Sequence, residues 1–193
     1  MTRETLRIAL LHMDVEYHNR GRNLAVLLDL VSRAASLGAK IICAPEMCLT
    51  GYVQKSLTAI SNLAETDDGP AQAALSAAAM ASGAFVAAGW AEKSESGVLY
   101  NASRVFAPDG TTVCRYKKIN AESRWAAPGP NRQYNIFQTP WGAVGVLICA
   151  DSYHSLLCRI TAMRGASLIL LPSNWPDDLW SFPELLWRQR AYE

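Results

Sequence analysis

The chain has 193 residues, 50% of them hydrophobic, and its 18 basic and 17 acidic side chains leave a formal net charge of +1. A chain of this size and composition buries a substantial core, so we expect one domain over residues 1–193, neither disordered nor fibrous. The charges are spread without a run of one sign, which gives no support for a nucleic-acid partner or an anionic membrane surface.

The N-terminal residues and the cysteines indicate the compartment. The first apolar stretch, of about eight residues, ends before Asp14 and is too short for a signal peptide, and no stretch approaches the roughly twenty apolar residues of a membrane span. The cysteines form no C-x-x-C pair, which argues against a zinc site and a disulfide framework. We therefore expect a soluble, cytoplasmic protein with reduced thiols and no metal.

The chain begins with a strand, a helix and a second strand. Residues 6–13 predict a buried strand, residues 21–38 carry apolar residues at helical spacing, and residues 39–46 predict a strand broken by Pro45. A strand-helix-strand unit calls for a parallel pair with a right-handed crossover.

A second helix is expected over residues 69–83, with Asp67 and Asp68 as candidate caps, and it leads to a strand over residues 84–92. Residues 98–117 then alternate and turn at Asp109-Gly110, where both residues can adopt positive φ, which indicates a hairpin.

Strands and helices alternate again in the last third of the chain. Such units mixed with hairpins indicate an α/β layered domain with both sheet faces covered. In order, we expect a strand, a helix, a strand and the start of a helix over residues 141–150, 155–166, 167–176 and 182–193.

Three chemically capable residues each follow an apolar, strand-like run. Glu46, Lys118 and Cys149 stand just past such runs, so the thiol is expected at the mouth of a sheet. A thiol attacks only as the thiolate, and it needs a nearby base or positive charge at neutral pH. Glu46 could accept the proton, while Lys118 and the Ala150 N–H could stabilise an oxyanion.

The set Glu, Lys and Cys is chemically sufficient for acyl transfer, but the three residues meet only if the fold brings them together. Taken separately, each has a simpler structural interpretation. Glu46 could start a helix, Lys118 could be a solvated charge, and Cys149 could belong to the core. His154 is an alternative base for the thiol, although it should lie on the following helix.

Considered together, these segments resemble the nitrilase superfamily of carbon-nitrogen hydrolases. The elements occur in family order along the whole chain, and the resemblance is to an amidase-like member. They are the opening segment with Asn23, "PEMCLTGY", "YKKIN", "ESRWAAPG", "LICAD", "RGASLILLPSNWP" and "RQRAYE".

The resemblance implies a fold, a mechanism and a set of site residues. The fold would be a four-layer α-β-β-α sandwich, and Glu46, Lys118 and Cys149 would be the general base, the oxyanion cation and the nucleophile. Glu122 would hydrogen-bond near Lys118 and the substrate. Substrate contacts are expected from Tyr52, Trp125, Asn174 and Trp175, and no cofactor or metal is implied.

Three departures from the family pattern limit what the resemblance implies. Tyr153, His154, Ser155 and Leu156 stand where the family has arginine, phenylalanine, proline and glutamate. Asn120 replaces the histidine of the lysine motif, which should change a supporting hydrogen bond. The chain also stops at Glu193, before the family's last strands, so we expect an incomplete C-terminus and an exposed apolar patch.

The leading functional hypothesis is hydrolysis of a small amide or N-carbamoyl compound through a thioester on Cys149. Nitrile hydrolysis on the same cysteine, an amidotransferase module and a catalytically idle homologue that acts as an interaction module are the alternatives. The family's habit of pairing through helices predicts a homodimer or a larger homo-oligomer.

Overall fold

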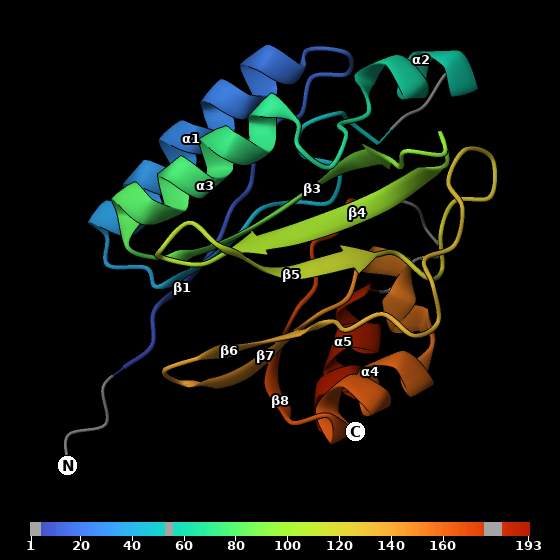
Figure 1. The fold of residues 1–193 in the computed structure, drawn as a ribbon. Helices are drawn as coiled ribbons and strands as arrows, with labels where there is room; N and C mark the ends of the chain where they lie inside the picture. The colour runs from blue at the N-terminus through green and yellow to red at the C-terminus, as the bar shows by residue number, and fades with distance from the viewer. Residues whose placement is uncertain (1–4, 53–55, 176–182) are drawn as a thin grey trace.

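The computed structural model describes residues 5–52, 56–175 and 183–193, and it stacks two β-sheets between helices (Figure 1). The first sheet contains, in spatial order, β1 (Ile8–Leu10), β2 (Ile41–Cys43), β3 (Phe85–Lys93), β4 (Leu99–Phe106) and β5 (Thr112–Lys117). The second contains β6 (Ile136–Thr139), β7 (Gly142–Val146) and β8 (Ala166–Leu170).

Helices cover the outer faces of the two sheets. Helices α1 (Arg20–Ser36) and α3 (Pro70–Ser82) lie on the first sheet, and α4 (Ser155–Met163) and α5 (Pro183–Tyr192) lie beyond the second (Figure 1). This arrangement confirms the α/β class and the α-β-β-α sandwich that the resemblance implies.

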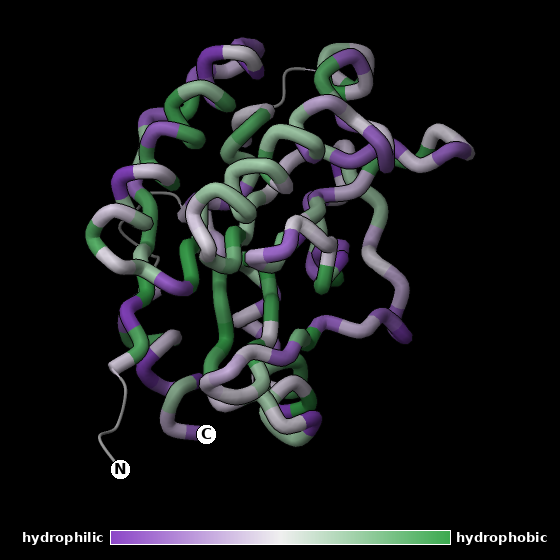
Figure 2. The backbone as a smooth tube through the Cα atoms, turned by 60° about the vertical axis from the view of Figure 1, so that its left-hand side comes forward, coloured by the Kyte–Doolittle hydropathy of each residue, from purple (hydrophilic) through white to green (hydrophobic). Residues whose placement is uncertain are grey.

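The residues of β3 show why the layers stack in this way. Phe85 and Ala87 face the second sheet, whereas Val86, Ala88 and Trp90 pack under α1 and α3. Successive strand residues point to opposite faces, so one continuous apolar strand supplies two separate cores. The hydrophobic segments accordingly gather at the centre of the molecule, and hydrophilic residues concentrate on the outer helices and loops (Figure 2).

The predicted strand-helix-strand unit is present, because β1 and β2 pair in parallel on either side of α1 in the sequence. The prediction that the first strand is buried was wrong. Among the described strands, β1 is an edge strand that pairs only with β2, and Leu10 is 79% exposed. An edge strand has a neighbour on one side only, which leaves its other side open to solvent.

The predicted caps of the second helix were also wrong. The N-cap of α3 is Gly69, which makes no side-chain capping bond, and Pro70 occupies the first turn. Asp67 instead pairs with Arg104 and with Arg115. Arg104 is 1% exposed, and a buried guanidinium needs carboxylate partners more than a helix end needs a cap.

The hairpin between β4 and β5 is confirmed, but its turn differs from the predicted one. Of the two central residues, only Gly110 has positive φ, at 83°. The Asp109 carboxylate accepts a hydrogen bond from the Thr111 backbone N–H at 2.9 Å, which stabilises a longer turn without a left-handed aspartate.

Several short elements escaped prediction, and two predicted boundaries cannot be compared. Strand β6, helix α2 (Leu57–Leu63) and the 3₁₀ turn η1 (Cys149–Tyr153) are too short to give a clear periodic pattern. Pro176 and Phe182, at the ends of two predicted elements, lie outside the described residues.

The described helices include none that is long and apolar enough to cross a bilayer. Several apolar side chains on the outer helices are exposed, namely Leu156, Met163, Leu185 and Tyr192. The contiguous apolar patch expected from the sequence stays a prediction.

Candidate active site

The site forms where strands of both sheets end. β2 runs parallel to β3, β4 runs antiparallel to β3, and β5 runs antiparallel to β4, so β2 and β5 end at the same edge of the first sheet. Glu46 follows β2, and Lys118 directly follows β5. Cys149 follows β7 of the second sheet, at the start of η1.

Glu46 and Lys118 form a buried ion pair. The Lys118 ammonium donates a hydrogen bond to Glu46 Oε1 at 2.7 Å, and each residue is 1% exposed. Burial disfavours the charged ammonium, but the Glu46 carboxylate and its hydrogen bond hold the pKa of Lys118 above its ordinary value. The site therefore keeps a fixed positive charge at neutral pH.

Two further donors complete the surroundings of the Glu46 carboxylate. The side-chain amide of Asn101 donates to Oε1 at 2.7 Å, and the backbone N–H of Asn174 donates to Oε2 at 2.9 Å. Charge-assisted hydrogen bonds of this length are the strong ones, so the carboxylate is held in one orientation.

Cys149 lies beside this pair in a backbone conformation that non-glycine residues rarely adopt. Its φ is 43°, and its N–H donates to the carbonyl of Pro172 at 3.0 Å. Burial, and then the negative charge and hydrogen bond of Glu46, raise the pKa of the thiol to about 12, although Lys118 acts in the opposite direction. The resting thiol is therefore protonated, and a base must remove its proton before attack.

This pKa predicts how free Cys149 reacts with iodoacetamide. We expect the alkylation rate to rise about tenfold per pH unit from pH 7 through pH 9 without a plateau, because the thiolate fraction grows throughout that range. Peptide mass spectrometry at each pH measures the modified fraction. A plateau below pH 9 would contradict the raised pKa, and the Cys149→Ala variant identifies the background signal.

The Ala150 N–H has no acceptor within the described part of the chain, unlike its neighbours. The N–H groups of Cys149 and Asp151 donate to Pro172 and Ile148, at 3.0 and 2.9 Å. An unoccupied backbone donor beside the thiol is what an oxyanion hole requires.

A buried carboxylate fixes the turn that carries Cys149. Asp151 accepts hydrogen bonds from the Tyr116 hydroxyl at 2.8 Å, from the Ile148 N–H at 3.0 Å and from the Asn120 N–H at 2.7 Å. The Asn120 side chain also donates to the Ala150 carbonyl at 2.8 Å. Together these bonds connect the nucleophile turn to the segment that follows β5, which carries Lys118.

Tyr52 and Glu122 lie near Lys118, and Trp125 belongs to an apolar cluster beside Tyr52. The Glu122 carboxylate pairs with Arg124 at 3.0 Å, and that hydrogen bond, together with the nearby Lys118, lowers its pKa. The Tyr52 ring lies 5.7 Å from the Lys118 ammonium. Trp125 is 7% exposed and belongs to the apolar cluster that Tyr52 packs against.

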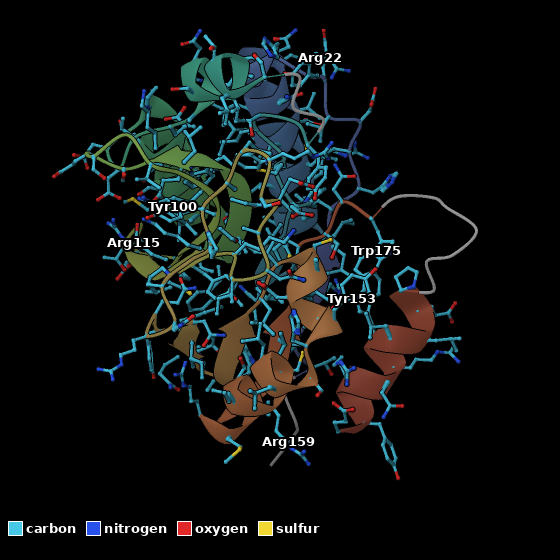
Figure 3. All side chains as sticks on the ribbon, turned by 90° about the vertical axis from the view of Figure 1, so that its right-hand side faces the viewer. Arg22, Tyr100, Arg115, Tyr153, Arg159 and Trp175 are labelled. Carbon is cyan, nitrogen blue, oxygen red and sulfur yellow. The ribbon has the colours of Figure 1, made fainter. Side chains whose placement is uncertain are left out.

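Asn174 contacts Glu46 through its backbone N–H, and the residue is otherwise exposed. Trp175 packs against Tyr153, with their ring centroids 5.2 Å apart, and Figure 3 shows the two near α5. Tyr153 and His154 are exposed. The described contacts of His154 do not include the Cys149 thiol, so the base in contact with that thiol is Glu46.

The sequence interpretation did not include Asn101, Asp151 and Tyr116. Asn101 carried a usable signal, since asparagine is depleted in strands and this one stands inside "LYNASRVF". Asp151 stood in the "LICAD" motif without a role. Tyr116 stood in the "YKKIN" segment without a role, and no local pattern predicts its hydrogen bond to Asp151, which lies 35 residues away in sequence.

No group of three or more potential metal ligands occurs in residues 5–52, 56–175 and 183–193.

Known proteins resemble this chain in sequence and structure. The sequence model of the carbon-nitrogen hydrolase family matches residues 7–193. The mouse omega-amidase NIT2 is 31% identical over 204 residues, which cover 98% of this chain and 71% of the relative. The human omega-amidase NIT2 is 30% identical with the same coverage.

Two solved structures share the fold. Nit3 of Saccharomyces cerevisiae, a member of branch 10 of the nitrilase superfamily, superposes with a TM-score of 0.86 at 23% identity. An amidase from Nesterenkonia sp. superposes with a TM-score of 0.80 at 23% identity. Each alignment covers 96% of this chain and 71% of the other.

Proposed function

Because this chain belongs to the carbon-nitrogen hydrolase family, we propose that it hydrolyses the C–N bond of a small amide or N-carbamoyl compound through a thioester on Cys149. The observation that carries the proposal is the convergence of Glu46, Lys118 and Cys149 in one buried cluster. Nucleophile, base and fixed cation are the three parts that acyl transfer requires.

In the proposed first half-reaction, Glu46 takes the proton of the Cys149 thiol as the sulfur attacks the carbonyl carbon. The Lys118 ammonium and the Ala150 N–H stabilise the negative oxygen that forms. Glu46 then transfers the proton to the nitrogen, the C–N bond breaks, and ammonia or an amine leaves.

In the second half-reaction, Glu46 removes a proton from water, and the resulting hydroxide attacks the thioester carbonyl. The C–S bond breaks, the sulfur recovers its proton from Glu46, and a carboxylic acid leaves. Glu46 carries each proton in turn, so no step needs a cofactor. Its hydrogen bonds to Lys118, Asn101 and Asn174 keep it in place throughout.

We assign the substrate-binding surface to Tyr52, Glu122, Trp125, Asn174 and Trp175. Four of them lie near the ion pair or the Cys149 turn, and Trp125 belongs to the apolar cluster that Tyr52 packs against. Tyr52 is half-buried against the Lys118 ammonium, so its ring limits the space beside the reacting carbon. Several relatives are omega-amidases, which favours an amide over a nitrile. We also propose that the protein is cytoplasmic and that it forms a homodimer or a larger homo-oligomer.

The test is a panel of small amides, N-carbamoyl compounds and nitriles, with released ammonia as the measurement. We expect ammonia from at least one amide or N-carbamoyl compound, together with an acyl-enzyme whose mass increase equals that of the acyl group. Peptide mapping should place that adduct on Cys149. Turnover of nitriles alone, or an adduct on another residue, would contradict the proposal.

A further inference from the structure

Asn101 contacts both charged members of the site. Its side-chain amide donates to Glu46 Oε1 at 2.7 Å, and its backbone carbonyl accepts the Lys118 N–H at 2.8 Å. Asn101 is 1% exposed and lies on β4, which pairs with β3 on one side and with β5 on the other. One residue therefore fixes the carboxylate and the lysine backbone relative to each other.

The hydrogen bonds make the two oxygens of Glu46 unequal. Oε1 accepts from both Lys118 and Asn101, at 2.7 Å each. Oε2 accepts from the Asn174 N–H, and the same N–H lies against the Cys149 thiol. Oε1 is thus occupied by two side-chain donors, whereas Oε2 shares the Asn174 N–H with the Cys149 sulfur.

We propose that Asn101 is a positioning residue, which commits Oε1 of Glu46 to hydrogen bonding and leaves Oε2 as the oxygen that carries the proton. This inference rests on the proposed function, since it assigns the path of the proton in that reaction. It assigns a different role to each of the two oxygens of the Glu46 carboxylate.

The surroundings of Asn101 argue that its N–H group, and not its volume, is what matters. Its Oδ1 is buried without a hydrogen-bond partner among the described residues. Apolar Leu99 and Ala91 lie nearby, on β4 and opposite Asn101 on β3. A buried amide oxygen without a partner costs free energy that a leucine would not. The donor to Glu46 is the feature that offsets this cost.

Two variants test the donor. Asn101→Leu removes the N–H from Glu46 Oε1 at similar volume, and Asn101→Ala removes it together with most of the side chain. We expect each to lower kcat/KM for an amide by roughly 10- to 100-fold, since small misplacements of a catalytic group cost about that much. KM should change by less than kcat.

The readout specific to positioning is a comparison of two substrates with the same acyl group, one an amide and one a nitrophenyl ester. An amine must receive a proton from Glu46 to leave, whereas nitrophenolate leaves without one. The amide-to-ester ratio of kcat/KM should therefore fall in both variants. A purely structural role would lower the two reactions equally.

The matched control is Asn135→Leu. Asn135 is 3% exposed, and its side chain donates to Val146 and Thr161, outside the Glu46 pair. This variant should lose stability in a thermal melt but keep the amide-to-ester ratio.

Two results would overturn the role of Asn101. The first is an amide kcat/KM in the Asn101 variants that stays within twofold of the unchanged protein. The second is an equal loss of kcat/KM for the amide and for the ester. An unchanged protein that hydrolyses the ester but no amide would refute the proposed function itself, and this role with it.

Discussion

Replacement of Cys149 by alanine is expected to abolish amide turnover, with a fall in kcat of roughly 10⁴-fold or more, because the variant cannot form a covalent intermediate. The change deletes only the sulfur of a residue that is 5% exposed, and the Glu46–Lys118 pair stays intact. Ammonia release measures the loss. Intact-protein mass spectrometry should show that the acyl adduct is absent.

Cys114→Ala is the matched control for this change. Cys114 is 4% exposed, and burial raises the pKa of its thiol to about 12, as it does for Cys149, but no charged residue contributes to that shift. We expect the Cys114 variant to keep its turnover. Comparable turnover in the Cys149 variant would eliminate the proposed nucleophile.

Replacement of Lys118 by methionine is expected to destabilise the fold as well as to reduce turnover. The change leaves the Glu46 carboxylate buried with no cation, and breaking such a pair from one side costs about 3–5 kcal/mol. Loss of the oxyanion cation should also lower kcat by roughly 10²- to 10³-fold. Urea unfolding and ammonia release measure the two effects separately.

A double variant separates stability from catalysis. Glu46→Gln combined with Lys118→Met removes both charges, so the free energy of unfolding should recover most of the loss while activity stays absent. A cost below about 1 kcal/mol for Lys118→Met alone would mean that the pair contributes little more than a surface salt bridge. That result would contradict the buried geometry.

The sequence predicts those parts of the fold and site that depend on local pattern. Apolar runs located β2, β3 and β7, and the residues just past β2, β5 and β7 are those that meet in the structure. Spacing alone could not show that Glu46, Lys118 and Cys149 converge. That prediction came from the order of the family motifs, and the Lys118–Glu46 contact at 2.7 Å agrees with it.

The predictions that failed depended on tertiary context. Leu10 is apolar and stands in an apolar run, which is typical of a buried strand. The sheet order shows instead that β1 is an edge strand. Asp67 has the chemistry of a cap, but buried Arg104 on β4 binds it. The hydrogen bond from Asn101 to Glu46 likewise joins residues 55 positions apart, and no local pattern encodes it.

The bond from the Asn174 N–H to Glu46 spans 128 residues of sequence and has a consequence for biosynthesis. The ribosome synthesises Glu46 before Lys118, Cys149 and Asn174, so its contacts with these residues cannot form until each of them has emerged. Contacts between distant residues form slowly because a long loop must close first. The hydrogen-bonding environment of Glu46 is therefore completed only after residue 174 has been synthesised.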